Sequence, residues 1–262
     1  MSSPIRIERD GPVATLTIDR PAQHNAVSYE MWGLLGEAAR GLAADPSLRV
    51  VVLTGAGGRA FSAGADIKDF AAHRSSSEKA TEYARVFEGA LEAVETLPVP
   101  VIAMIDGICV GGGAELACCA DLRIASDAST FAVPVAKVGV LLGYAEMRRL
   151  LALVGRAAAT DLLLTARTLD AHEAARLGLV HRVTARDALA GEVYGLAERM
   201  AGFAPLTQAG HKRIIRIVGA DPAGRHLTAE EEALPLSIFD TEDAAEGYRA
   251  FVEKRAPKFT GR

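Results

Sequence analysis

The stretch that decides the fold is residues 105–126, IDGICVGGGAELACCADLRIAS. The apolar run Val101–Ile105 that leads into it predicts a buried strand. Gly107–Gly113 predict a glycine-rich loop, which opens a helix near Gly112. Leu122–Ala125 predict a further short strand. A strand, a loop, a helix and another strand in this order indicate an α/β protein.

A second glycine-rich loop lies earlier in the chain. Residues 49–54, RVVVLT, form a continuous β-branched run, which is typical of a strand covered on both faces. The loop Gly55–Asp69 follows it and contains residues 61–68, FSAGADIK. Because its side chains are small, the backbone of this loop can approach a ligand closely.

The remaining elements are predicted from periodicity and turn signals. Asp10-Gly11 separates two segments of period-two alternation, which predicts a β-hairpin. Ser28 can cap a helix, and helical periodicity dominates beyond Gly143. The expected elements are strands over Ile5–Asp10, Val13–Ile18, Thr130–Val133 and near Leu179–Val183, and helices over about 29–43 and 78–97. We expect a strand-and-helix core over residues 1–185 and a helical C-terminal region over residues 186–262.

Composition excludes several classes of protein. Half of the 262 residues are hydrophobic, which predicts a substantial core. The net charge of −4 argues against broad nucleic-acid binding, which needs a basic face. Three cysteines (Cys109, Cys118 and Cys119) make no disulfide framework, so we expect a reducing, cytoplasmic location. The N-terminus lacks the apolar core of a signal peptide, and Asp106 and Glu115 interrupt the most apolar stretch, so we expect no membrane span.

The two glycine-rich loops also allow a chemical interpretation. Gly55–Ala60 fits the loose dinucleotide pattern GxGxxA, but another turn follows it rather than a helix, which disfavours a nicotinamide site. Two such loops can instead direct two backbone N–H donors at one oxygen, as in an oxyanion hole. Glu115 follows Gly112 by three residues, so its carboxylate would lie one turn along the same helix face. The alternative is that the glycines only permit tight packing and that Glu115 is an acid of the first helical turn.

Four motifs resemble the enoyl-CoA hydratase/isomerase (crotonase) superfamily: FSAGADIKDF from Phe61, IDGICVGGGAELACCADLRIAS from Ile105, ARTLDAHEAARLGLVHRV from Ala166, and FVEKRAPKFTGR from Phe251. This resemblance implies a spiral of ββα units followed by C-terminal helices that build a homotrimer or a hexamer. It also implies an acyl-CoA substrate and no cofactor or metal beyond the coenzyme A that the substrate carries. The implied partners include neither nucleic acid nor a membrane.

The resemblance also implies particular site residues. Ala65 and Gly112 would donate backbone N–H groups to the thioester carbonyl, and Glu115 would be the catalytic acid/base. The substrate-binding residues implied by position are Ala65, Asp66, Ile67, Lys68, Gly112, Val135 and Lys258, with Lys258 acting from the basic C-terminal tail or across a subunit interface.

One position departs from the family pattern. Family hydratases carry a second glutamate just after a proline, and here Val135 follows Pro134. A hydrocarbon side chain cannot transfer protons. Hydratase-type chemistry is the leading interpretation; isomerisation or decarboxylation with one glutamate, or a CoA-binding pseudoenzyme, are alternatives. Glu146 is the next acid along the chain and is expected to be a surface acid, and Tyr144 is a weaker candidate for the pocket.

Overall fold

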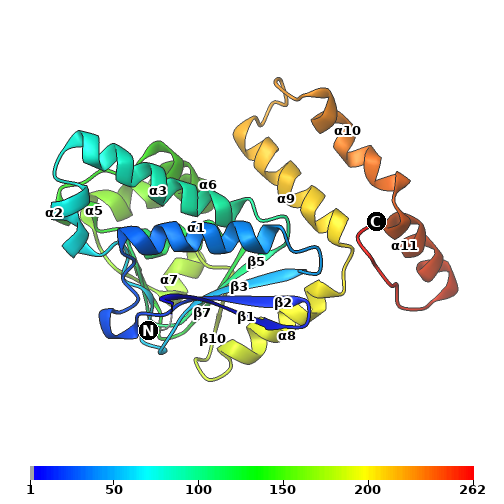
Figure 1. The fold of residues 1–262 in the computed structure, drawn as a ribbon, viewed down its shortest axis with the longest axis horizontal. Helices are drawn as coiled ribbons and strands as arrows, with labels where there is room; N and C mark the ends of the chain where they lie inside the picture. The colour runs from blue at the N-terminus through cyan, green and yellow to red at the C-terminus, as the bar shows by residue number, and fades with distance from the viewer. Residues whose placement is uncertain (1–2) are drawn as a thin grey trace.

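The structure is a computed structural model that describes residues 3–262; Met1 and Ser2, the start of the segment expected not to be a signal peptide, lie outside the described residues. Two sheets form its framework (Figure 1). The larger sheet has the order β1-β2-β3-β5-β7-β10 and is parallel except for the antiparallel pair of β1 and β2. Its strands are β1 (Ile5–Asp10), β2 (Val13–Ile18), β3 (Val50–Gly55), β5 (Val101–Ile105), β7 (Leu122–Ser126) and β10 (Arg182–Thr184).

The smaller sheet has the order β4-β6-β8-β9. Its strands are β4 (Ala60–Ser62), β6 (Ile108–Val110), β8 (Thr130–Ala132) and β9 (Leu169–Asp170). Three of them, β4, β6 and β9, were not predicted, because two or three residues carry no readable periodicity. Pairing between distant segments creates them, and two of them lie inside the stretches predicted as glycine-rich loops.

Helices cover both faces of the larger sheet. The helices of the described residues are α1 (Tyr29–Ala43), α2 (Phe70–His73), α3 (Ser77–Glu95), α4 (Gly112–Cys118), α5 (Val135–Val138), α6 (Tyr144–Thr165), α7 (Ala171–Arg176), α8 (Leu189–Ala201), α9 (Pro205–Ala220), α10 (Ala229–Ser237) and α11 (Glu242–Glu253). Short 3-10 turns span Pro21–Gln23, Ile67–Asp69 and Ile238–Asp240. None of the helices described in residues 3–262 has both the length and the hydrophobicity that crossing a bilayer requires.

Successive side chains of β3 point to opposite faces of the larger sheet, and both faces are covered by helices. Val51 and Leu53 belong to the main core, which α1 and α3 close, whereas Val50 and Val52 pack against α8 on the other face. The continuous apolar run of this strand is therefore buried on both faces, as predicted. The predicted hairpin, the helix over 29–43 and the α/β class are confirmed; the strand expected near 179–183 lies at Arg182–Thr184.

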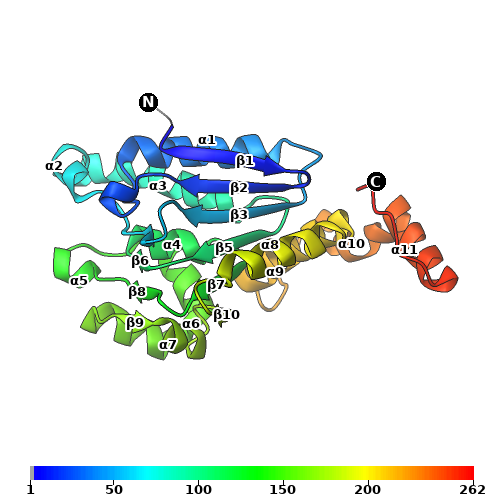
Figure 2. The ribbon, with the colours of Figure 1, turned by 90° about the horizontal axis from the view of Figure 1, so that it is seen from below.

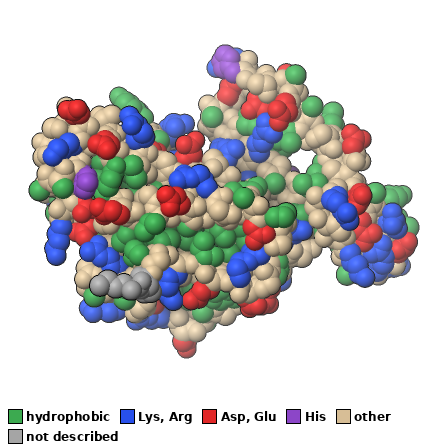
Figure 3. Space-filling view, in the orientation of Figure 1, with side chains coloured by type: hydrophobic (Ala, Val, Ile, Leu, Met, Phe, Trp, Pro, Cys, Tyr) green, Lys and Arg blue, Asp and Glu red, His purple; other side chains and the backbone are tan. Residues whose placement is uncertain are grey.

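The C-terminal region divides into two parts. The predicted boundary at residues 185 and 186 falls just before α8, yet α8 packs on the core sheet through Leu189, Val193 and Ala197. The helices that extend away from the core are α9, α10 and α11 (Figures 1 and 2). The space-filling view shows an open gap between α9 and α10 (Figure 3). In the same view, hydrophobic side chains gather on the core between α1 and the β1–β2 hairpin.

The extended arm exposes many large apolar side chains. Exposed fractions on the arm and at its base reach 71% for Ile215, 74% for Phe239 and 85% for Phe251. Burying apolar side chains of this size lowers the free energy, but no other part of the same chain packs over them. The arm therefore has the properties of a surface that other subunits bury.

We predict that the protein associates through this arm into a trimer or hexamer, because association would bury these apolar side chains. Light scattering coupled to size-exclusion chromatography should give a mass of about three or six times 27.5 kDa at micromolar concentration. Phe239→Glu, which places a charge on the exposed face, should lower this mass, whereas Ile7→Glu on the core hairpin should not. A monomeric wild-type protein would contradict the prediction.

Candidate active site

The loops after β4 and β6 meet at two glycines. Gly64 has φ +93°, and a Cβ built on it would lie 2.7 Å from the carbonyl oxygen of Val110 and 3.0 Å from the nitrogen of Gly112. A Cβ on Gly112 would in turn lie 3.3 Å from the nitrogen of Ala65. Any larger residue at Gly64 would therefore be strained and would force the two loops apart. Segments about fifty residues apart in the sequence thus come into backbone contact.

The amides of Ala65 and Gly112 lie close together and have no acceptor within residues 3–262. A Cβ lies about 2.5 Å from the nitrogen of its own residue, so the two amide nitrogens are at most about 6 Å apart. One oxygen can accept from both donors at this separation. The Val27 amide donates to the Gly64 carbonyl at 2.8 Å, and the Val27 carbonyl accepts from the Asp66 amide at 2.9 Å. Because these bonds lie on one side of residues 64–66, the Ala65 N–H points to the opposite side.

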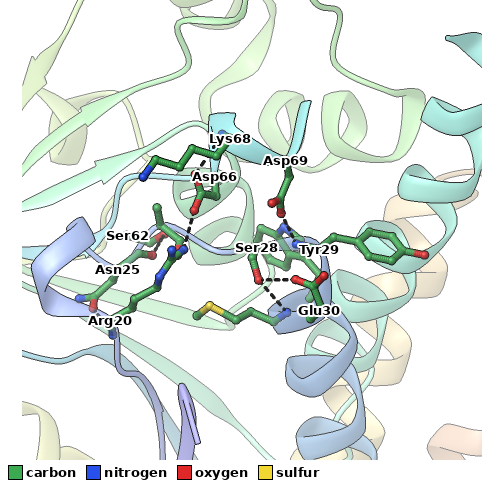
Figure 4. Close-up of polar contacts among 12 residues, drawn as sticks. Arg20, Asn25, Ser28, Tyr29, Glu30, Ser62, Asp66, Lys68 and Asp69 are labelled. Atoms are coloured by element: carbon green, nitrogen blue, oxygen red, sulfur yellow. Dashed lines mark hydrogen bonds and ion pairs between the residues drawn. The ribbon is translucent and has the colours of Figure 1, made fainter. Parts of the chain in front are cut away.

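The backbone after Ala65 is fixed by two carboxylates (Figure 4). Asp66 pairs with the Arg20 guanidinium at 2.6 Å and accepts a hydrogen bond from the Lys68 amide at 3.1 Å. Asp69 accepts a hydrogen bond from the Tyr29 amide at 2.5 Å. The Arg20 guanidinium and these hydrogen bonds lower the pKa of Asp66. The charge of Asp66 thus holds the loop, while the side chains of Ile67 and Lys68 are exposed.

Helix α4 begins at Gly112 and carries Glu115 one turn further into the protein. Its first residue, Gly112, packs beneath Trp32 of α1, whose ring nitrogen donates to Tyr83 at 3.0 Å. Arg123 is 2% exposed and donates to the carbonyls of Ala117 at 3.4 Å and Ala120 at 2.5 Å, at the C-terminal end of α4. A cation at this end is favoured by the helix dipole. The helix is thereby held at both ends.

Glu115 lies one turn into α4 and is partly buried. Loss of hydration raises its pKa to about 8, with a further contribution from the negative charge of Glu146. The positive charges of Arg74 and Arg149 lower the pKa of Glu115, but by less than burial and Glu146 raise it. A carboxyl with this pKa holds its proton at neutral pH and can still exchange it, which suits an acid/base catalyst.

An apolar pocket lies beside Glu115. Its walls come from α4, β8, α6 and the segments near β9 and β10, and its lining residues are Ala114, Glu115, Cys118, Phe131, Ala132, Val133, Leu142, Glu146, Leu150, Leu162, Leu169 and Leu179. Two of these twelve residues, Glu115 and Glu146, are ionisable carboxylic acids. Such a pocket with few polar groups is typical of a site for a small, mainly apolar ligand group.

Glu146 departs from the sequence-based expectation. It was expected to be a surface acid in the first turn of a helix, and it does lie in the first turn of α6, but its side chain lines the pocket with Glu115. The pattern of α6 alone gives no sign of this, because the pocket forms only when α6 packs against α4. Tyr144, which begins α6, is 94% exposed and does not line the pocket.

Two further residues predicted for substrate binding lie apart from Glu115. Val135 begins α5 and packs against the core without lining the pocket described here. Lys258 lies after α11, where its amide donates to Glu246 at 2.9 Å. Both views place this tail at the opposite end of the molecule from α2 and α5. Contact between Lys258 and this site therefore requires a neighbouring subunit.

Comparisons with known proteins agree with this geometry. The family model for enoyl-CoA hydratase/isomerase matches residues 8–262. A probable enoyl-CoA hydratase of Mycobacterium bovis is 38% identical over 258 residues, which cover 98% of each chain. The carnitinyl-CoA dehydratase of Citrobacter koseri is 37% identical over 265 residues, with 100% of both chains covered. The crystal structure of an enoyl-CoA hydratase/carnithine racemase from Magnetospirillum magneticum matches with a TM-score of 0.95 and 42% identity, covering 100% of this chain and 97% of that one.

These similarities cover both sheets and the C-terminal helices. The glycine loops on which the sequence resemblance rests are also the loops that meet at Gly64 and Gly112. The chain therefore belongs to the enoyl-CoA hydratase/isomerase family of enzymes and has the crotonase fold.

Proposed function

We propose that this protein is a hydro-lyase that adds water to an enoyl-CoA thioester or removes it from a 3-hydroxyacyl-CoA. The observation that carries the proposal is the juxtaposition of two unused amides, Ala65 and Gly112, with a carboxyl group whose pKa is about 8 at Glu115. Two relatives that match over nearly their whole length are named as a hydratase and a dehydratase. Both names describe the same chemistry run in opposite directions.

The amides would act on the thioester carbonyl. Removing a proton from the carbon beside a thioester, or adding water at the β-carbon of an enoyl thioester, places negative charge on the carbonyl oxygen, and two N–H donors stabilise that charge. Each donor in such a site contributes roughly 2.7–4 kcal/mol to transition-state stabilisation. Glu115 would deliver or remove the proton, and the apolar pocket would hold the acyl chain and exclude water.

The exposed face of the first loop is suited to the nucleotide end of coenzyme A. The side chain of Lys68 is exposed to solvent, while Asp66 fixes the backbone of the same loop through its ion pair with Arg20. Lys258 would add a second positive charge only from another subunit. A single lysine gives a modest and salt-dependent contribution to phosphate binding, because exposed charges are screened.

Isomerisation is the second candidate reaction. Val135 stands where family hydratases carry a glutamate, and one carboxyl group is enough to move a proton between two carbons of an enoyl chain. A turnover screen over crotonyl-CoA, 3-hydroxybutyryl-CoA, a 3-enoyl-CoA and a malonyl-type thioester separates water addition, water removal, isomerisation and decarboxylation. Binding of these thioesters without turnover of any would instead indicate a pseudoenzyme.

We predict that Glu115→Gln lowers kcat about 10²–10⁴-fold while retaining thioester binding, because the amide keeps the shape but cannot transfer a proton. Steady-state kinetics on the best substrate and calorimetric binding of a non-reactive thioester check this. Glu92→Gln on the exposed face of α3 serves as the control. Wild-type turnover by the Glu115 variant would exclude Glu115 as the proton carrier.

We predict that Glu115 also makes stability depend on pH. Its pKa of about 8 in the folded state exceeds the value of 4.5 that is usual for a glutamate exposed to water, so the folded protein holds a proton that the unfolded chain loses. Stability should therefore fall as the pH rises from about 5 to about 8. Glu115→Gln should remove this dependence and raise Tm relative to wild type by roughly 5 °C more at pH 8 than at pH 5. An equal Tm difference at both pH values would contradict the prediction.

We predict that Gly112→Pro lowers kcat about 10²–10³-fold, because proline removes the N–H donor at a first helical position that otherwise tolerates it. Gly112→Ala is the matched variant: it also introduces a Cβ, 3.2 Å from Trp32, but keeps the donor. Its loss should be clearly smaller. Equal losses in the two variants would assign the effect to packing rather than to the hydrogen bond.

A further inference from the structure

The pocket beside Glu115 contains a carboxylate network that the reaction described above does not use. Glu146 of α6 lines the pocket together with Glu115. Glu88 of α3 lies close enough to Glu146 for this second carboxyl group to raise its pKa. Arg149, one turn further along α6, binds Glu88 at 3.2 Å and Glu95 at 2.9 Å. Three helices thus hold these groups against the wall of the active-site pocket.

The N-terminus of α6 leaves space for the Glu146 carboxylate. A Cβ on Gly143 would clash with Oε2 of Glu146 and would lie 3.2 Å from its Oε1. The carboxylate therefore occupies the space that a side chain at Gly143 would fill. Glu146 itself lies in the first turn of α6.

Glu88 has one oxygen that needs a proton. Its Oε2 accepts the hydrogen bond from Arg149, whereas its Oε1 is buried and has no donor within residues 3–262. Burial and the neighbouring Glu146 raise the pKa of Glu88 to about 7. When Glu88 is protonated, its hydroxyl is a donor that the neighbouring Glu146 can accept.

We propose that Glu146 is the second proton-transferring carboxylate of this active site and that Glu88, held by Arg149, positions it. The proposal rests on the hydro-lyase function. Family hydratases carry their second glutamate at the position of Val135. In this chain we assign the same role, proton transfer, to a residue of α6. Glu146 reaches the pocket from a different element, eleven positions further along the chain.

The chemical step balances with these two groups. In hydration, the Glu146 carboxylate takes a proton from water as the water oxygen forms a bond to the β-carbon. The electrons of the double bond move to the thioester oxygen, which the amides of Ala65 and Gly112 stabilise. The enolate then collapses and the α-carbon takes the proton of Glu115. Exchange with solvent returns a proton to Glu115 and removes the one on Glu146, and dehydration follows the same path in reverse.

The charges around the pair fit these roles. Glu146 and Glu88 raise the pKa of Glu115, and Arg74 and Arg149 lower it. Glu95 is held by Arg149 at the outer end of the network. Burial, with a smaller contribution from Glu146, thus keeps Glu115 protonated at neutral pH, as its role as the acid requires.

The first test is Glu146→Gln, compared with Glu88→Gln and with the exposed control Glu92→Gln. Glu146→Gln should lower kcat for hydration about 10²–10³-fold with KM changed less than about threefold. It should also move the alkaline limb of kcat/KM to lower pH, because Glu115 loses a negative neighbour. Glu88→Gln should lower kcat about tenfold. A loss of kcat with KM nearly unchanged in a folded Glu146→Gln, beside an unchanged kcat in Glu92→Gln, distinguishes proton transfer from a structural role.

The second test moves the carboxylate without removing it. Gly143→Ala should displace Glu146 and lower kcat at least tenfold, while Gly33→Ala, where a Cβ meets no atom within 4 Å, should leave kcat unchanged. In folded protein, ¹³C NMR titration should show a lower pKa for Glu115 in Glu146→Gln than in wild type. This measurement needs no substrate.

The outcomes separate the inference from the proposed function. Hydration by Glu146→Gln within about threefold of wild type, with Glu115→Gln inactive, would overturn the role of Glu146 and leave the hydro-lyase function intact. A rate gain in Val135→Glu together with an unchanged Glu146→Gln would do the same. If the wild type adds water to no enoyl-CoA and removes it from no 3-hydroxyacyl-CoA, the proposed function fails, and the inference fails with it.

Discussion

The close approach of two backbone segments at Gly64 and Gly112 is the constraint on which the site depends. No side chain fits between them, because a Cβ on Gly64 would lie 2.7 Å from a carbonyl oxygen. The contact joins the loop after β4 to the helix after β6, and these two strands are paired in the smaller sheet. Pairing of β4 with β6 therefore determines where two amide donors meet. The glycines let the sheet bring the donors close enough for one oxygen to bind both.

Buried polar groups keep this contact in place. Asn25 is fully buried, with φ 56°, and its amide donates to the carbonyls of Ala56 at 2.9 Å and Ala60 at 2.7 Å. Ser62 donates to the Asn25 carbonyl at 2.8 Å and accepts from the Gly64 amide at 3.1 Å. Each such group costs about 1–3 kcal/mol if its partner is removed. The loop at Gly64 is thus tied to the core through a chain of satisfied hydrogen bonds.

The sequence predicted the parts of this structure that local patterns encode. Short-range signals mark the strands around Leu16 and Val52, the cap at Ser28 and the helix start at Gly112. The structure has each of these features within one or two residues of its predicted place. The second sheet was missed because its strands are too short to show a period. The position of Glu146 was missed for a related reason: a glutamate in a first helical turn is ordinary, and only the packing of α6 against α4 turns it toward the pocket.

The same distinction explains why a motif alone does not determine the chemistry of this chain. Val135 breaks the sequence pattern of two glutamates, yet the folded pocket still contains two carboxylic acids, Glu115 and Glu146. What matters physically is whether an acid and a base face one apolar space with different proton affinities. Burial in α4 gives Glu115 a pKa of about 8, and Glu146 lines the same pocket from the first turn of α6. A fold that packs several helices around one pocket can therefore supply the second carboxylate from more than one element.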